Sequence, residues 1–348
     1  MSVKAGQSPG NEIAATVQMD SRLWRGKRVL VAGGLGFIGS NLAHRLVREG
    51  AIVSLIDCLQ PEYGGNHFNI ADIGDKIAVH IADLRDAATM RSLVCDQDVL
   101  FNLAGQTSHL DSMRDPQTDL EMNCRAQLCL LDACREKNRS IKIVFASTRQ
   151  IYGVPQYLPV DEKHPRVPVD VNGANKLAGE NYHLVYSRAY GMHVSVLRLT
   201  NTYGPRMRVK DERQTFLGVW LRQLIEGVPI RVFGDGKQIR DFNFVDDVET
   251  ALLMAAGNPE ADGRIFNLGS SDAVSLGELA QLLVEINGGG SVEQIEFPLE
   301  RKSIDIGDYR SDYRLISKTL GWKPRVFLRE GLERTLAFYQ QHHEHYWE

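Results

Sequence analysis

The sequence has few of the residues that mark secreted, metal-binding or membrane proteins. Five of its 348 residues are cysteine, without a C-x-x-C pair or a histidine–cysteine cluster at metal-ligand spacing, which argues against a disulfide framework and a metal site. The apolar runs are no longer than strands, so no transmembrane span is expected, and the N-terminus lacks the apolar core of a signal peptide. The net charge of −4 is no signature of a nucleic-acid or membrane partner. These absences predict a cytoplasmic protein with reduced cysteines.

What the sequence does contain is a series of short apolar runs, most of them separated by helix-length amphipathic segments. Continuous apolar strands that alternate with helices predict an α/β fold, a doubly wound parallel sheet of the Rossmann type. After residue 199 the glycines and prolines are denser and the runs shorter, which predicts a smaller mixed α/β lobe at the carboxyl ends of the strands. The predicted strands lie at residues 28–32, 51–56, 77–81, 98–103, 141–146 and 193–199.

The expected domains follow from this change of pattern. Residues 1–25 are polar without a sustained period and are expected to form a flexible N-terminal extension. Residues 26–199 should form the Rossmann-type domain, with 241–270 returning to it. Residues 200–240 and 271–348 should form the C-terminal substrate lobe.

Three spaced glycines join the first predicted strand to the first predicted helix. Gly33, Gly36 and Gly39 allow a tight turn, close approach of backbone N–H groups to a pyrophosphate, and close packing of helix on strand. Asp57 ends the second strand, 24 residues after Gly33, where a carboxylate would accept hydrogen bonds from an adenosine ribose. That carboxylate would repel a 2′-phosphate and no arginine follows it, so the pattern predicts NAD rather than NADP as the cofactor.

Further motifs follow in order over nearly the whole chain from Arg28. They are GGLGFIG at 33–39, ADLRD at 82–86, NLAGQ at 102–106, STRQIYG at 147–153, NTYGPR at 201–206, RDFNFVDD at 240–247 and a segment at 312–324 that ends in LGWKP. Together they resemble the extended short-chain dehydrogenase/reductase family of nucleotide-sugar epimerases and dehydratases. The resemblance implies an NAD-dependent enzyme acting on a nucleoside-diphosphate sugar. It also implies a homodimer formed through the helices that carry Asn123 and Lys176.

The same resemblance implies roles for individual residues. Thr148 would hydrogen-bond the sugar hydroxyl that is oxidised, Lys176 would hold the nicotinamide ribose, and Asp83 would touch the adenine. The expected cofactor-binding residues are Gly33, Gly36, Phe37, Ile38, Asp57, Asp83, Leu84, Leu103, Ala104 and Lys176. The expected substrate-binding residues are Ser108, Thr148, Asn201, Arg206, Arg240 and Arg301.

Two arginines have open alternatives at this stage. Arg206 would either pair with the C6 carboxylate of a uronate sugar, or contact a phosphate or lie as a surface charge. Arg149 would either contact the sugar or point to solvent. The resemblance does not decide between these alternatives.

One position departs from the family pattern. Family members carry Tyr-x-x-x-Lys on the helix after the Thr148 strand, and the tyrosinate takes a proton from the sugar hydroxyl. Here the lysine is Lys176 but the tyrosine position is Asn172, whose amide cannot act as a general base. Three interpretations remain: another group supplies the base, the protein binds its ligands without fast turnover, or the chain is an engineered knock-out. Thr148, Lys176 and Asn172 are the expected catalytic positions, and the candidate replacements for the tyrosine are Thr148, Lys176, Tyr152, Tyr203, His109 and Asp111.

The residues after Thr148 bear on the reaction. Dehydratases of the family carry Asp-Glu or Ser-Glu there, and the decarboxylases usually carry Glu at the second position. This chain has Arg149 and Gln150, without a carboxylate. Epimerisation needs none, so the sequence predicts a 4-epimerase of a UDP-hexose or UDP-hexuronate that recycles a tightly held NAD. The alternatives are a dehydratase or decarboxylase, and a non-catalytic NAD- and nucleotide-sugar-binding regulator.

Overall fold

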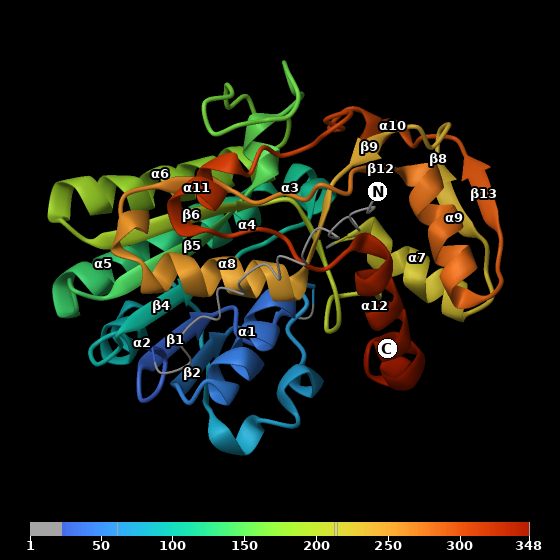
Figure 1. Cartoon of the computed structure of the whole chain (residues 1–348). Helices are drawn as coiled ribbons and strands as arrows, with labels where there is room; N and C mark the ends of the chain where they lie inside the picture. The colour runs from blue at the N-terminus through green and yellow to red at the C-terminus, as the bar shows by residue number, and fades with distance from the viewer. Residues whose placement is uncertain (1–22, 61, 212, 214, 348) are drawn as a thin grey trace, which may run out of the picture.

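The chain folds around a seven-stranded parallel sheet (Figure 1). The computed structural model describes residues 23–347 except positions 61, 212 and 214. The strand order is β11-β6-β5-β4-β1-β2-β3, and every neighbouring pair is parallel, which confirms the doubly wound fold. The strands are β1 (Arg28–Ala32), β2 (Ile52–Asp57), β3 (Ala78–Ile81), β4 (Val99–Asn102), β5 (Lys142–Thr148), β6 (His193–Leu199) and β11 (Ile265–Asn267).

Helices cover both faces of this sheet, as the apolar strands require. On one face α1 (Phe37–Arg48), α8 (Val245–Gly257) and α11 (Arg314–Leu320) share a core cluster with it. On the other face α2 (Ala87–Leu93), α5 (Ala126–Lys137) and α6 (Val171–Tyr190) do so. Two short helices, α3 (His109–Arg114) and α4 (Pro116–Leu120), follow β4 and lead through a π turn into α5.

The second lobe has a core cluster of its own and lies at the right of Figure 1. Three two-stranded sheets and several helices build it. Its pairs are β7 (Asn201–Tyr203) with β10 (Phe242–Phe244), β8 (Ile230–Phe233) with β13 (Val292–Ile295), and β9 (Ile239–Arg240) with β12 (Val274–Ser275). Its helices are α7 (Phe216–Ile225), α9 (Leu276–Asn287), α10 (Leu299–Lys302) and α12 (Leu328–His342).

Two details differ from the sequence prediction. Trp24, expected in the extension, is only 2% exposed and packs against Phe101, because its large apolar ring gains from burial. Residues 1–22 of that extension lie outside the described residues. The seventh strand, β11, was not among the expected apolar runs because only three of its residues pair with β6.

In the part of the chain that the structure describes, no helix combines the length and the apolar character that crossing a bilayer would require.

Candidate active site

Two hollows lie at the carboxyl ends of the sheet strands. The first, which we call the dinucleotide cleft, is lined by the glycine-rich turn, the ends of β2 and β4, and the segment after β3. The second, the lobe cavity, has a volume of about 480 Å³ and is lined by α3, the turn after β5, and residues of the smaller lobe. The segment 105–108 serves both, since Gly105 and Thr107 line the cleft and Ser108 lines the lobe cavity.

The dinucleotide cleft fits a pyrophosphate at the start of α1. Gly33 has a φ of +77°, a left-handed conformation that other residues rarely adopt. Gly36 is the N-cap of α1 and provides no side-chain cap, so the first backbone N–H groups of the helix remain available to an anion. The turn is therefore built as the glycine spacing predicts.

Two carboxylates line the cleft farther from the turn. Asp57 accepts hydrogen bonds from the backbone N–H groups of Leu35 at 3.0 Å and Leu59 at 2.9 Å, which fixes its side chain at the end of β2. Burial raises the pKa of Asp57. Asp83 pairs with Arg85 at 2.6 Å, and this hydrogen bond lowers the pKa of Asp83. Both aspartates are therefore held in fixed orientations in the wall of the cleft.

All the expected cofactor-binding residues except Lys176 line the dinucleotide cleft. Lys176 is buried on α6, where its Nζ donates to the carbonyl of Ala146 at 3.2 Å. A β-carbon placed on Gly105 would lie 3.1 Å from this Nζ, so the amine sits directly behind the cleft wall. Burial lowers the pKa of Lys176 to about 8.

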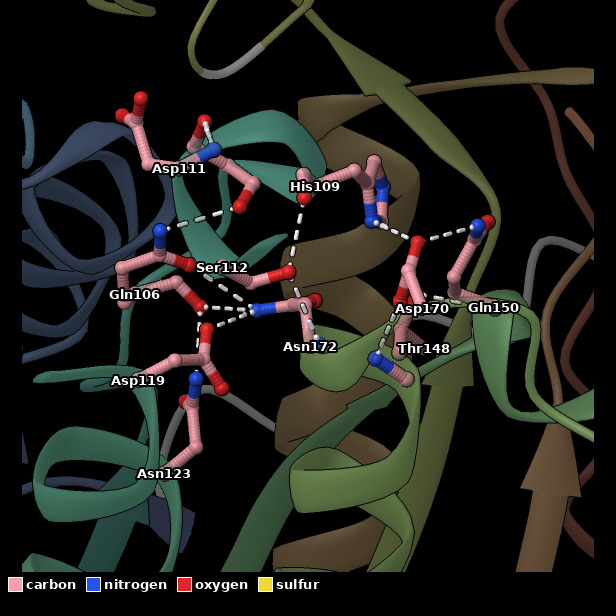
Figure 2. A network of polar contacts seen from close by, with 12 residues as sticks. Gln106, His109, Asp111, Ser112, Asp119, Asn123, Thr148, Gln150, Asp170 and Asn172 are labelled. Atoms are coloured by element: carbon pink, nitrogen blue, oxygen red, sulfur yellow. Dashed lines mark hydrogen bonds and ion pairs between the residues drawn. The ribbon is translucent and has the colours of Figure 1, made fainter. Parts of the chain in front are cut away.

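Asn172, at the tyrosine position, is held inside a polar network (Figure 2). Its Nδ2 lies 2.8 Å from the carbonyl of Gln106, 3.0 Å from Oε1 of the same residue, and 3.0 Å from Oδ2 of Asp119. Its backbone N–H donates to Ser112 Oγ at 3.1 Å. The side chain lines neither hollow, so its role here is to join α6 to the segment after β4.

The two candidate tyrosines are also in the interior. Tyr152 is fully buried, accepts a hydrogen bond from Arg198 and donates to Asn267, and burial raises its pKa to about 12. Tyr203 lies in the core of the smaller lobe, and burial raises its pKa as well. Because both phenols are buried in core clusters and donate hydrogen bonds there, neither takes the place of the missing tyrosine.

The other candidate replacements for the tyrosine, Thr148, Asp111 and His109, are less deeply buried than the two tyrosines. Thr148 ends β5, and its Oγ1 accepts a hydrogen bond from the backbone of Gln150 at 3.2 Å. Asp111 lines the lobe cavity but pairs with Arg213 at 2.8 Å. His109 also lines it, and its partner is Asp170 at 2.9 Å rather than Asp111.

Of the expected substrate-binding residues, Ser108, Asn201, Arg240 and Arg301 line the lobe cavity, whereas Thr148 and Arg206 do not. Arg206 is turned to the outer side of the glycine-rich turn instead. It donates to Asn69 at 3.1 Å and Asn41 at 2.9 Å, and stacks over Phe338. Arg206 therefore lies outside the lobe cavity, because its guanidinium donates to the Asn69 backbone carbonyl and to the Asn41 side chain on α1.

The lobe cavity is strongly cationic. Arg149 does not point to solvent: its Nη2 donates to Asn201 at 2.9 Å, and its buried Nη1 has no hydrogen-bond partner among the described residues. Burial lowers the pKa of Arg240 to about 10, with the nearby Arg149 contributing. Such a wall suits a diphosphate. The arginines among the described lining residues are Arg114, Arg149, Arg213, Arg231, Arg240 and Arg301.

Known proteins resemble this chain over most of its length. The profile of the NAD dependent epimerase/dehydratase family matches residues 29–269. The UDP-glucose 4-epimerase of Mycolicibacterium smegmatis is 33% identical over 90% of this chain and 98% of its own. UDP-glucuronic acid decarboxylase 1 of Xenopus tropicalis is 29% identical over 92% of this chain and 73% of its own. The crystal structure of the UDP-glucose 4-epimerase of Thermus thermophilus, a complex with NAD, has a TM-score of 0.81 at 30% identity, covering 90% of this chain and 99% of that one.

Proposed function

The chain belongs to the NAD-dependent epimerase/dehydratase family, and we propose that it epimerises C4 of a nucleoside-diphosphate sugar, a UDP-hexose or UDP-hexuronate. Its cofactor is NAD. The observation that supports epimerisation over dehydration is that the aspartates of the lobe cavity are paired with arginines. Each of the three aspartates among the described lining residues of the lobe cavity contacts an arginine: Asp111 contacts Arg213, Asp211 contacts Arg208, and Asp305 contacts Arg240. Carboxylates held in this way do not provide the acid/base pair that removal of water needs.

The dinucleotide cleft would bind NAD, and the lobe cavity would bind the sugar nucleotide. The N-terminus of α1 would hold the pyrophosphate and Asp57 the adenosine ribose. Lys176 would hold the nicotinamide ribose from behind the cleft wall at Gly105. Arg240 and Arg301 would hold the diphosphate of the sugar nucleotide. Bound NAD supplies the hydride acceptor for C4 and returns the hydride to the opposite face after the keto-sugar rotates. We also propose a homodimer through α5 and α6, by likeness to the family.

A second candidate is supported by Asn172. Because its amide is committed to Gln106 and Asp119, the chain could hold NAD and a nucleotide sugar as a regulator without turnover. Incubation with NAD and a pool of hexose and hexuronate nucleotides, followed by chromatography and mass spectrometry, separates the two. We expect a new peak of unchanged mass. A product lighter by water or carbon dioxide would replace the epimerase proposal by dehydration or decarboxylation, and binding without any product would establish the regulator.

Replacement of Thr148 by valine should lower the turnover of the epimerase by about 100-fold, because a hydrogen bond to the reacting hydroxyl is lost. Kinetic measurement of kcat, with calorimetric measurement of the NAD dissociation constant, checks this. Thr148→Val also removes the hydrogen bond that the hydroxyl of Thr148 accepts from the backbone N–H of Gln150, which should lower the free energy of unfolding by about 1 kcal/mol. Thr148→Ser keeps the hydroxyl and is the matched control, so equal losses in the two variants would show that Thr148 does not contact the substrate.

A further inference from the structure

The missing tyrosine leaves the site without its usual proton acceptor, and the structure offers another one. We propose that His109, held by Asp170, is the acid/base of the reaction: its Nε2 takes the proton of the sugar hydroxyl at C4 and later returns it. This inference rests on the proposed function. It is supported by the position of His109 in the lobe cavity, the burial and hydrogen bonds of Asp170, and the short distance along the chain from Asp170 to Asn172.

His109 is the only histidine among the described residues that line either hollow. It is the first residue of α3, directly after Ser108, and its side chain is 40% exposed. Its Nδ1 lies 2.9 Å from Oδ2 of Asp170, an ion-pair contact in which the ring N–H is not aligned for a hydrogen bond, and Figure 2 shows the two side chains in contact. A neutral imidazole that carries its proton on Nδ1 has a lone pair on Nε2, which is the form a general base needs.

Asp170 is built as a fixed anion. Its side chain is 0% exposed. As the N-cap of α6 it accepts a hydrogen bond from the N–H of Gly173 at 2.6 Å, and it accepts a second from Gln150 Nε2 at 2.8 Å. Burial alone would raise the pKa of Asp170, but the adjacent His109, with these donors, brings it below its ordinary value. An ionised, immobile carboxylate orients the imidazole and stabilises it when it becomes charged.

The pair lies close in the chain to the tyrosine position. Asp170 precedes Asn172 by two residues at the start of α6, and Gln150 belongs to the turn that Thr148 caps. The His109–Asp170 pair therefore bridges the two segments that carry Thr148 and the tyrosine position (Figure 2). Lys176, another titratable group near this place, donates to Ala146 behind the cleft wall and lines neither hollow.

The proton transfer balances with the established cofactor. The O–H bond at C4 breaks and its proton passes to Nε2, while the oxygen electron pair forms the second C–O bond and the C4–H hydride leaves to the oxidised nicotinamide. On return of the hydride, the imidazolium gives its proton back to the oxygen. No further oxidant, reductant or co-reactant is required.

The test uses His109→Ala and Asp170→Asn in the full-length protein with NAD and the nucleotide sugar that the wild type converts. We expect kcat to fall by about 10²–10⁴-fold in His109→Ala and by about 100-fold or more in Asp170→Asn. KM and the calorimetric dissociation constants for NAD and for UDP should stay within about twofold, a change of less than about 0.5 kcal/mol. Added imidazole should restore part of the activity of His109→Ala only. Asparagine is itself a good N-cap, so Asp170→Asn should keep α6 folded.

His193→Ala is the matched control, because His193 and Asp262 also form a pair at 2.7 Å but line neither hollow. It should leave kcat unchanged. An active wild type with an unchanged kcat in His109→Ala would overturn the pair and leave the proposed function intact. A loss in His109→Ala with a raised KM and no response to imidazole would assign His109 to substrate positioning and also overturn the proposal. A wild type that binds both ligands but makes no product would overturn the proposed function and the pair together.

Discussion

Replacement of Gly39 by alanine should weaken NAD binding strongly and lower the free energy of unfolding. Gly39 lies in the first turn of α1, where an added β-carbon would overlap the carbonyl oxygen of Gly33 and approach the backbone of Gly34. Because backbone atoms cannot rotate away as a side chain can, the turn must shift, at a cost of about 1–3 kcal/mol. The same shift moves the N–H groups that would face the pyrophosphate. We expect the affinity for NAD to fall by about 100-fold, or about 2.7 kcal/mol.

Calorimetric titration with NAD and urea denaturation measure the two effects of Gly39→Ala separately. Gly74→Ala is the control, since a β-carbon there meets no heavy atom within 4 Å and the residue lies outside the dinucleotide cleft. It should leave the affinity for NAD unchanged. Wild-type affinity in Gly39→Ala would mean that NAD is bound away from the start of α1.

Replacement of Arg198 by methionine should destabilise the protein by about 3–5 kcal/mol, because it leaves a buried carboxylate without its main partner. Arg198 is 1% exposed on β6, the strand that lies between β5 and the edge strand β11. It forms two contacts with Glu180, at 2.5 and 3.0 Å, and donates to Tyr152 at 2.6 Å. Glu180 is fully buried on α6, so an unpaired charge there would be far from water.

Urea denaturation of three variants checks this prediction. Arg198→Met should unfold at much lower urea concentration than the wild type. The double variant Arg198→Met/Glu180→Leu should regain part of the loss, because it removes the second charge as well. Arg91→Met breaks the surface pair with Glu136 and should change stability by less than about 1 kcal/mol. A small effect of Arg198→Met alone would show that Glu180 takes up a proton or that water reaches it.

The sequence by itself determined six of the seven strands of the sheet, the glycine-rich turn and nearly all of the residues that were expected to line the dinucleotide cleft. These features depend on local sequence, because an apolar run marks each strand. Residues at the carboxyl ends of parallel strands then lie at the same edge of the sheet, independently of the loop conformations. Gly33, Asp57 and Leu103 belong to three different segments, and all of them line the dinucleotide cleft as expected. The departure at Asn172 was visible in the sequence for the same reason, since a motif position is defined by neighbouring residues.

Only the tertiary structure decided which side chains are partners. His109 meets Asp170 rather than its neighbour Asp111, Arg206 meets amides beside α1 rather than the lobe cavity, and Arg198 meets Glu180. A buried arginine needs a partner, and the sequence did not show that Glu180 supplies it for Arg198. Pairs of this kind depend on how α3, α6 and the strand ends pack against one another. The pattern of apolar and polar residues specifies which face of an element is buried, and it does not specify which long polar side chains reach across the interface.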